Sequence, residues 1–594
     1  MNLQISAVLR AYFDGSFIPA QLIAEICDRI DAYPDPAVWI SRVPRASLLA
    51  RAAALDPAQR DQMPLWGVPF AVKDNIDVAG MDTTAACPAF AYRATQNAVA
   101  VEHLIAAGAI LVGKTNLDQF ATGLNGTRSP YGAPRNVFDP QYISGGSSSG
   151  SGVAVGAGLV SFALGTDTAG SGRVPAAFNN IVGLKPTKGA VSATGMVPAC
   201  RSIDCISVLA ANVGDADLVY RVMRGFDPTD GFSRSIRDIP LRNEKFCFGV
   251  LAAEDREFCG DHEAASLYQS AIDQLEFLGG TSVAIDYAPF RDAAALLYEG
   301  AFVAERYVAI GDFAAAHRNE MDATVAHIVA ESGSFTAAEA FQAIYRLHEL
   351  AQLAKVQWER IDFLLLPTAP TIFTVAQLLA DPIRYNSLLG IYTNFVNLLD
   401  CAAMAIPAGF CSSSHLPFGV SLIGPAFTDR ALAYHADRLH RALKLPVANT
   451  GEFPAADAVL ATPSDGRLFI AVAGAHLSGM PLNPQLTSLG ATLSRAALTA
   501  PGYRLYALAN TVPAKPGLVR DPGFTGPGIA IEIWSLSQAA FGTFVASLPR
   551  PMCIGKIELA EGGEVPGFLC EPAALAGATD ITHSGGWRAF CRDR

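Results

Sequence analysis

The first sixty residues have the apolar spacing of amphipathic helices. Apolar side chains recur at i, i+3 and i+4 in "AQLIAEICDRIDAY" (20–33) and in "RASLLARAAALD" (45–56). This period places one apolar stripe along each helix. A longer helical pattern covers roughly residues 292–360.

Beyond residue 60, short strand-like runs alternate with helical ones. "WGVPFAVKDNIDV" (66–78) predicts strand, turn and strand, and "AVAVEHLIAAG" (98–108) predicts a helix. Three further runs are predicted to be strands: "AILVGKT", "CISVLAANV" and the buried "DFLLLPTAP". Such alternation is typical of an α/β fold with a sheet covered by helices.

The periodicity stops around residues 446–465, where proline, asparagine, glycine and aspartate cluster as in a linker. After it, strand-like runs separated by turns surround one helical run, "LSQAAFGTFVASL". We therefore expect a first domain at 1–445, a linker at 446–465 and a small α+β domain at 466–594.

Composition restricts the class of partner. The chain has 594 residues, is 51% hydrophobic and carries a net charge of −12 without a basic run. This argues against nucleic acid and against an anionic membrane. Its longest apolar stretch, 152–165, is shorter than the roughly 20 residues of a membrane helix.

Cysteine usage indicates the compartment. Eleven cysteines are scattered singly, without a CxxC pair or zinc-ligand spacing, which fits a reducing, cytoplasmic location. The N-terminus also lacks the apolar core of a signal peptide.

One motif fails on its context. "GAILVGKT" (108–115) matches the phosphate-loop pattern in every position. A phosphate loop needs a strand before its first glycine and a loop between its glycines. Here a predicted helix precedes Gly108 and "AILV" is itself the predicted strand, so we do not expect nucleotide binding.

Lys73 lies in an apolar strand-like run. Burial would lower its pKa and make the neutral amine a competent general base. The alternative is an ordinary surface ion pair with Asp74 or Asp77.

Two small-residue segments follow. "SGGSSSGSG" (144–152) has the composition of a flexible linker but stands between core-like runs. "GTDTAGS" (165–171) ends in Ser171, where small residues allow successive N–H groups to converge beside a nucleophile. A plain Ser/Gly turn is the alternative for the second segment.

Together these segments resemble the amidase signature family, over about residues 66–207. The resemblance implies Ser171 as nucleophile, Ser147 as a bridging serine on a cis peptide bond, and Lys73 as base. It places the oxyanion at the amides of Thr168, Ala169 and Gly170 with that of Ser171. One departure is Ser149, where many members have glycine.

The implied reaction needs no metal or organic cofactor. Neutral Lys73 takes a proton from Ser147, which takes one from Ser171 as that residue attacks an amide carbonyl. The proton then returns to the leaving ammonia, and water hydrolyses the acyl-enzyme. On this interpretation the serine- and glycine-rich segment is a rigid part of the site.

Tyr298 and Arg306 stand eight residues apart on a predicted helix, about 80° apart around its axis. Arginine suits bidentate binding of a carboxylate. The alternative is a surface network of Arg306 with Glu305 or Glu299.

Nearly the whole chain resembles the allophanate hydrolases, through "GTRSPYGAPRNVFDP", "YEGAFVAERY" and "VAGAHLSGMPLN". The resemblance implies that Tyr298 and Arg306 bind the carboxylate of allophanate. It implies a gamma-glutamylcyclotransferase-like second domain that helps to decarboxylate the first product, N-carboxycarbamate, through His476. A structural role for His476 is the alternative.

Other functions stay open at this point. A malonamate-type amidase would keep the same triad and use Arg306 for another carboxylate. An ammonia-channelling or scaffold subunit would need no catalysis. We expect a homodimer, with urea carboxylase as a possible functional partner.

Overall fold

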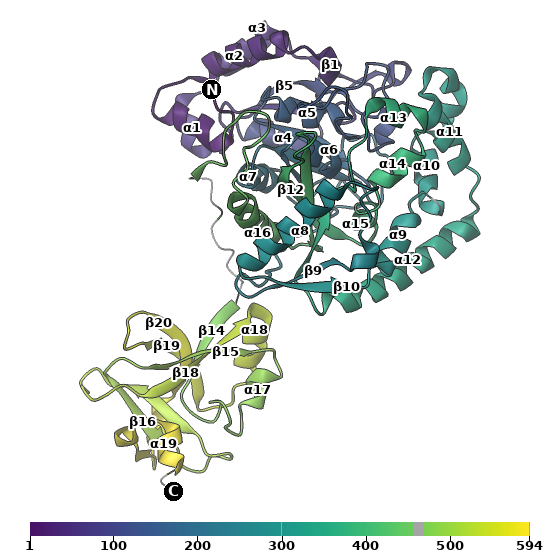
Figure 1. The fold of residues 1–594 in the computed structure, drawn as a ribbon. Coiled ribbons are helices and arrows are strands. Elements are labelled where there is room, and N and C mark those ends of the chain that lie inside the picture. The colour runs from purple at the N-terminus through teal and green to yellow at the C-terminus, as the bar shows by residue number, and fades with distance from the viewer. Residues whose placement is uncertain (299, 457–459, 461–466, 593–594) are drawn as a thin grey trace. The chain divides into compact units, whose positions relative to one another are not determined.

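The structure is a computed structural model that describes residues 1–298, 300–456, 460 and 467–592. The chain divides into two compact units, Met1–Pro463 and Ser464–Arg594, and each is described by itself (Figure 1). Among the described residues, no helix combines the length and apolarity needed to cross a membrane.

The first unit is built on one mixed sheet, which has eleven strands within the described residues. Its spatial order is β1 (Trp39–Arg42), β5 (Ile110–Thr115), β2 (Pro69–Lys73), β6 (Phe162–Asp167), β8 (Cys205–Ala210), β7 (Val182–Lys185), β12 (Cys401–Phe410), β13 (Pro417–Pro425), β11 (Phe363–Pro367), β9 (Cys247–Leu251) and β10 (Thr281–Ile285). A short ribbon of β3 (Asp82–Thr83) and β4 (Tyr92–Arg93) lies apart from it.

Strand direction sets up the site. β2 pairs in parallel with β5 on one side and with β6 on the other. Lys73 is in register with Thr115, and Val72 with Leu164. The carboxyl ends of these three strands therefore lie at the same edge, where side chains from distant parts of the chain can meet.

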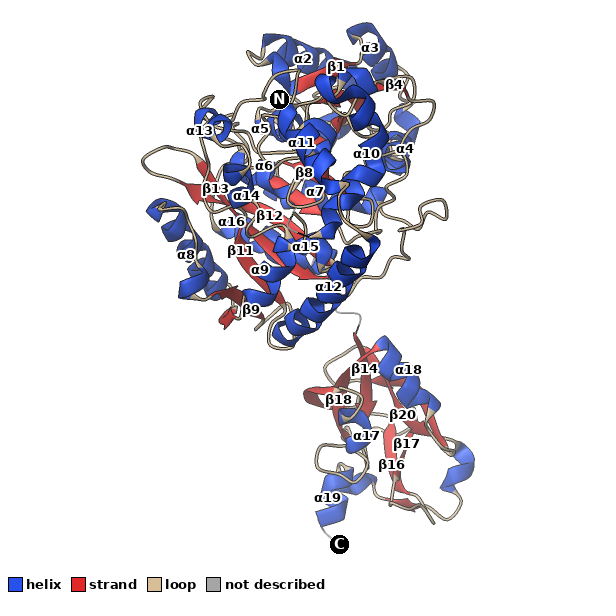
Figure 2. Cartoon of the chain, turned by 90° about the vertical axis from the view of Figure 1, so that its right-hand side faces the viewer, coloured by secondary structure: helices blue, strands red, loops and turns tan. Residues whose placement is uncertain are grey.

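The residues of β2, β5, β6 and β8 are all buried, so the sheet is covered on both faces. Helices enclose it (Figure 2). They are α1 (Ile5–Phe13), α2 (Pro19–Ala32), α3 (Arg45–Ala53), α4 (Val99–Ala106), α5 (Ser149–Gly156), α6 (Arg173–Phe178), α7 (Val213–Met223), α8 (His262–Phe277), α9 (Ala288–Ala295), α10 (Ala304–His317), α11 (Ala323–Ser332), α12 (Ala337–Trp358), α13 (Val375–Ala380), α14 (Arg384–Leu389), α15 (Phe395–Leu398) and α16 (Asp429–Ala442).

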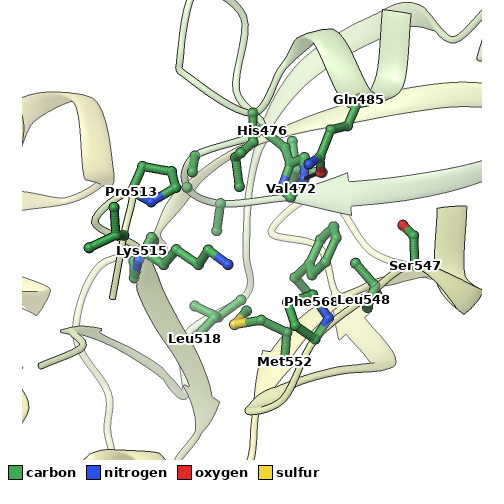
Figure 3. Close-up of a pocket in the computed structure, with 17 residues that line it drawn as sticks. Val472, His476, Gln485, Pro513, Lys515, Leu518, Ser547, Leu548, Met552 and Phe568 are labelled. Atoms are coloured by element: carbon green, nitrogen blue, oxygen red, sulfur yellow. Dashed lines mark hydrogen bonds between the residues drawn. The ribbon is translucent and has the colours of Figure 1, made fainter. Parts of the chain in front are cut away.

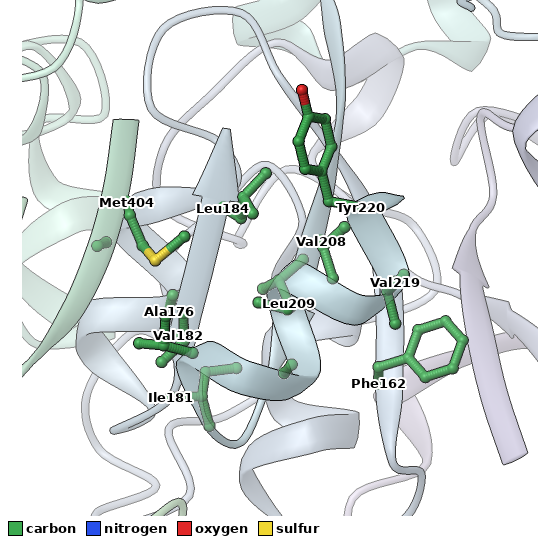
Figure 4. Close-up of a cluster of buried hydrophobic side chains, with 14 of the residues drawn as sticks. Phe162, Ala176, Ile181, Val182, Leu184, Val208, Leu209, Val219, Tyr220 and Met404 are labelled. Carbon is green, nitrogen blue, oxygen red and sulfur yellow. The ribbon is translucent and has the colours of Figure 1, made fainter. Parts of the chain in front are cut away.

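The core of this unit lies between sheet and helices. Val208 of β8 packs among Phe162 of β6, Leu184 of β7 and Val219 of α7 (Figure 4). α5 and α6 contact each other and the central strands, while α7 packs on β8 and α16 on β12 and β13. This packing fixes the two segments that precede α5 and α6.

The second unit is small and has its own apolar core. Its larger sheet has the order β15 (Thr492–Leu498), β18 (Ala530–Ser537), β14 (Arg467–Val472), β20 (Glu564–Cys570) and β19 (Met552–Glu558). A second sheet has the order β17 (Pro516–Arg520), β16 (Tyr503–Ala507) and β21 (Thr579–Asp580). Its helices are α17 (Pro484–Thr487), α18 (Gln538–Ala546) and α19 (Trp587–Arg592).

The expected α/β fold followed by a small α+β domain is confirmed. The strand expected after Lys73 is wrong, because the amide of Ile76 donates to the carbonyl of Lys73 (2.9 Å) and closes a turn. Ile76 makes only an isolated bridge to Met196.

Residues 446–456 of the predicted linker pack on the first unit, where the side chain of Asn180 donates to the carbonyls of Pro446 and Ala448. Its residues 457–459 and 461–465 lie outside the described residues.

Candidate active site

Lys73 ends β2 and is completely buried. Its Nζ donates to Ser147 Oγ at 2.7 Å and to Thr166 Oγ1 at 2.6 Å. Burial lowers the pKa of Lys73 to about 7, although the charges of Asp118, Asp204 and Asp167 oppose this effect. A substantial fraction of the amine is therefore neutral near pH 7 and can accept a proton.

The alternative of a surface ion pair at Lys73 is wrong. Asp74 lies 3.2 Å from the buried Nζ of Lys114. Asp77 accepts hydrogen bonds from the hydroxyls of Thr83 and Tyr92, both at 2.7 Å. Lys114 is thus a buried ion-pair partner on β5, a strand preceded by α4, so "GAILVGKT" lacks the context of a phosphate loop as expected.

The segment 144–152 is a buried turn leading into α5. The peptide bond between Gly146 and Ser147 is cis. A Cβ at Gly146 would lie 2.2 Å from the carboxylate of Asp118, and one at Gly150 would lie 2.4 Å from the carbonyl of Val38. These glycines allow close packing.

Serine side chains fasten this segment to the sheet. The hydroxyl of Ser148 donates to the carbonyl of Thr166 at 3.1 Å, and that of Ser151 to Leu164 at 2.9 Å. The hydroxyl of Ser149 lies 3.5 Å from the carbonyl of Asn116, its acceptor, so it is directed to the backbone.

Ser171 is buried immediately before α6. Its Oγ donates to the carbonyl of Gly123 at 3.4 Å, and its own carbonyl accepts from the amide of Ser148 at 3.3 Å. The structure therefore brings Lys73, the Ser147 segment and Ser171 together.

Asp167 shapes the turn that holds Ser171. Its carboxylate accepts from the amides of Gly170 (2.9 Å) and Gly172 (3.1 Å) and pairs with both Nε and Nη2 of Arg173 at 2.9 Å. The amide of Gly170 is thus engaged. Those of Thr168, Ala169 and Ser171 have no acceptor among the described residues and are available to an oxyanion.

Sequence reasoning missed the roles of Asp118 and Asp204. Asp118 accepts from the amides of Asn125, Gly126 and Arg128 at 3.0–3.2 Å and so holds the loop that contacts Ser171. Its place just beyond β5, beside the end of β2, is the signal that could have found it.

Asp204 braces the oxyanion segment from the other side. It accepts from the hydroxyl of Thr168 and from the amides of Ala199 (2.8 Å) and Cys200 (3.1 Å). Burial raises the pKa of Asp204 to about 6.

Tyr298 and Arg306 do not share a helix, so that prediction is wrong. α9 ends at Ala295 and α10 begins at Ala304, with Gly300 between them. Glycine in a helix interior costs about 1 kcal/mol relative to alanine, which favours a break there. The two side chains nevertheless meet, because the guanidinium of Arg306 lies 5.7 Å from the ring centre of Tyr298.

Arg306 is buried, and its Nη1 donates to Thr122 Oγ1 at 2.8 Å. Its Nε has no hydrogen-bond partner, and no carboxylate of the described residues is within ion-pair distance. The surface pair with Glu305 does not form, because Glu305 accepts from Ser202 instead. Glu299 lies outside the described residues.

His476 lies in the second unit, in the loop after β14 (Figure 3). Its Nε2 is 3.0 Å from Gln485 Oε1, and its ring stacks on Phe568 with centres 5.1 Å apart. Burial lowers the pKa of His476, despite the bond to Gln485, which raises it. His476 lines a cavity of about 310 Å³.

Comparison with known proteins places both units. Residues 21–433 match the model of the family described as Amidase. The chain belongs to the amidase family. Residues 468–592 match the allophanate hydrolase C-terminal domain. Among the described residues of this amidase, no group of three or more His, Cys, Asp and Glu side chains could hold a metal ion.

The amidase is similar over most of its length to two larger or equal-sized proteins. It is 44% identical over 575 residues to the urea amidolyase of Lachancea kluyveri, covering 94% of this chain and 31% of that protein. It thus spans about a third of such relatives. The structure of Kluyveromyces lactis allophanate hydrolase matches with a TM-score of 0.76 and 40% identity, over 98% of each chain.

A shorter relative covers only the first unit. This relative belongs to the glutamyl-tRNA(Gln) amidotransferase of Symbiobacterium thermophilum and is 34% identical over 465 residues, which are 72% of this chain and 94% of that protein. The second unit is therefore what this amidase has beyond that relative.

Proposed function

We propose that this amidase hydrolyses allophanate to ammonia and N-carboxycarbamate, through an acyl-enzyme on Ser171. The observation that carries the substrate is Arg306, a buried guanidinium with an unsatisfied Nε and no carboxylate partner among the described residues. A buried cation costs free energy unless it is paired, so a substrate carboxylate would complete it.

Arg306 is linked to the nucleophile through two adjacent residues. Thr122 accepts its hydrogen bond, and the carbonyl of Gly123 accepts the hydroxyl of Ser171. A short molecule with a carboxylate at one end and an amide at the other suits this arrangement, and allophanate has that shape. The likeness to the Kluyveromyces lactis allophanate hydrolase supports the same substrate.

In the proposed mechanism, neutral Lys73 removes the proton of Ser147 as Ser147 takes that of Ser171. The Ser171 oxygen attacks the terminal amide carbon, and the oxyanion is held by the amides of Thr168, Ala169 and Ser171. The C–N bond breaks, the returning proton leaves with ammonia, and water releases N-carboxycarbamate from Ser171.

The second unit would then act on that dianion. Loss of carbon dioxide leaves the electron pair of the broken bond on nitrogen, which needs a proton. We assign its delivery to His476. The lowered pKa of His476 leaves the free imidazole mainly neutral, and a bound dianion would raise that pKa and favour the proton-carrying form.

The proposal also concerns partners. Because related urea amidolyases are about three times as long as this chain, we infer a functional link to an enzyme that carboxylates urea. We also propose a homodimer, since α12 exposes Phe341, Tyr345, Leu353 and Val356 by more than half of their surface. Light scattering of the purified chain tests the dimer.

The substrate is tested by supplying allophanate and malonamate to the purified chain in parallel. We expect allophanate to release both nitrogens as ammonia and both carbons as carbon dioxide. Preferential turnover of malonamate would assign the chain to a malonamate-type amidase, and absence of any turnover would favour an ammonia-channelling subunit.

A further inference from the structure

The cavity of the second unit has an apolar wall and few polar groups (Figure 3). Leu518, Leu548, Met552 and Phe568 form much of this wall. At about 310 Å³, the cavity suits a small molecule. The described residues that line it include no acidic side chain.

Lys515 is the ammonium group of this cavity. Its side chain extends from the loop before β17 into the open space (Figure 3). The backbone of Lys515 is fixed, because its amide donates to Thr511 Oγ1 at 3.0 Å and its carbonyl accepts from the amide of Leu508 at 3.1 Å. No carboxylate of the described residues pairs with its Nζ. The cavity therefore presents an unneutralised positive charge.

His476 is held in one orientation nearby. Its ring is sandwiched against Phe568 at 11° and meets the edge of Phe544 at 89°. Gln485 Oε1 can only accept a hydrogen bond, so Nε2 carries the proton of the neutral ring. Nδ1 is then the nitrogen available to exchange a proton with a ligand.

We propose that Lys515 binds one carboxylate of a small dianion in this cavity and so positions the ligand for His476. This rests on the proposed function, because the dianion would be N-carboxycarbamate. Lysine binds carboxylates as a point charge, and it is the cation lining the cavity that needs no protonation at neutral pH.

The arrangement also selects the carboxylate that leaves. With one carboxylate at Lys515, the other lies against the apolar wall, where it loses hydration. The bond from its carbon to nitrogen breaks, carbon dioxide departs, and the nitrogen takes the electron pair and a proton from protonated His476. Carbamate remains at Lys515, and water reprotonates His476.

The test uses malonate, a stable dicarboxylate of the same length, with the full-length chain. Chain labelled at histidine Cε1 is titrated with malonate, and the signal of His476 is followed by NMR after assignment with His476→Ala. This signal reports the cavity and not the site at Arg306. We expect Lys515→Gln to weaken malonate binding about ten- to hundredfold and Lys515→Arg to restore most of it.

Lys556→Gln is the matched control, because Lys556 is exposed and pairs with Glu564 at 3.1 Å. It should bind malonate as the unaltered chain does. Acetate should bind more weakly than malonate. Unchanged affinity in Lys515→Gln, or a His476 signal that malonate does not move, would overturn the role of Lys515, and equal affinity for acetate would overturn the dianion.

The result is separable from the proposed function. If malonate binds through Lys515 but the chain does not hydrolyse allophanate, the anion site stands and the substrate proposal fails. If allophanate is hydrolysed but malonate binding ignores Lys515, the opposite holds.

Discussion

The backbone amide of Asp118 donates to the carbonyl of Ser147 at 3.1 Å, while the carboxylate of Asp118 packs against the adjacent Gly146. One residue thus contacts both sides of the turn that presents Ser147 to Lys73. The charge of Asp118 also acts on Lys73, where it opposes the larger effect of burial on the pKa. Asp118 is therefore a positioning residue with an electrostatic effect.

We predict that kcat/KM for allophanate falls as pH falls through about 7. Lys73 is the base only when neutral, so activity is lost where the ammonium form gains population, about tenfold per pH unit below the pKa. Asp118→Asn removes a charge that stabilises the ammonium and should move this acidic limb to lower pH. Initial rates between pH 5 and 9 measure it.

The exposed Asp61→Asn is the control for Asp118→Asn and should leave the profile in place. An unmoved limb in a folded Asp118→Asn chain would limit Asp118 to supporting the loop.

We predict strongly non-additive losses at Lys73 and Ser171. Ser171→Ala should abolish turnover, Lys73→Ala should come close to it, and the double variant should be hardly slower than Ser171→Ala, because both residues serve one proton relay. Single-turnover ammonia release measures this. A Lys73→Ala chain with near-normal rates would refute the assignment of the base.

Arg306→Ala should raise KM for allophanate, with the chain still folded. Losing a charge-assisted hydrogen bond removes about 1.5–3 kcal/mol of binding, or about ten- to hundredfold in kcat/KM. Tyr298→Phe should act in the same direction, but less. Steady-state kinetics with biuret, a neutral analogue, provide the contrast, because its turnover should not depend on Arg306.

The exposed Arg346→Ala is the matched control for these variants. Equal losses for allophanate and biuret in Arg306→Ala would indicate a packing role instead of carboxylate binding.

We predict that a chain ending at residue 463 still releases the first ammonia from allophanate. The first unit contains Lys73, Ser147 and Ser171 and retains the segment 446–456 that packs on it. His476→Ala in the full chain should likewise spare this step, and both changes should slow carbon dioxide formation. Stopped-flow detection is needed, because the intermediate also decays without catalysis.

Wild-type rates of carbon dioxide formation from both proteins would leave the second unit a structural role and remove His476 from the site.

Arg173→Ala should destabilise the first unit by about 3–5 kcal/mol, because it leaves the buried carboxylate of Asp167 without its partner. The exposed pair of Arg45 with Asp28 provides a comparison, and Arg45→Ala should cost less than about 1 kcal/mol. Urea unfolding measured by fluorescence checks both values. Similar losses in the two variants would contradict the assigned importance of the buried pair.

Local pattern was sufficient for much of the fold. The period of the apolar residues identified α2, α3 and β5, and the glycine and serine segments identified the turns at Ser147 and Ser171. The break between Tyr298 and Arg306 was missed, because the helical spacing continues across Gly300 while the chain does not.

The supporting carboxylates could not be predicted in the same way. Asp118 and Asp204 act on backbone amides and on Lys73 from separate segments of the chain. Such contacts depend on which strands become neighbours, and no local period or composition encodes that. The parallel pairing of β2 with β5 and β6 determines it.

The two units have separate apolar cores, and this affects how the protein can lose its structure. Heat or denaturant can melt one core while the other persists, so a single transition midpoint would not describe the chain. Calorimetry should then resolve two endotherms. A chain in which only the second core has melted would keep its nucleophile and release its dianionic product for solution chemistry to finish.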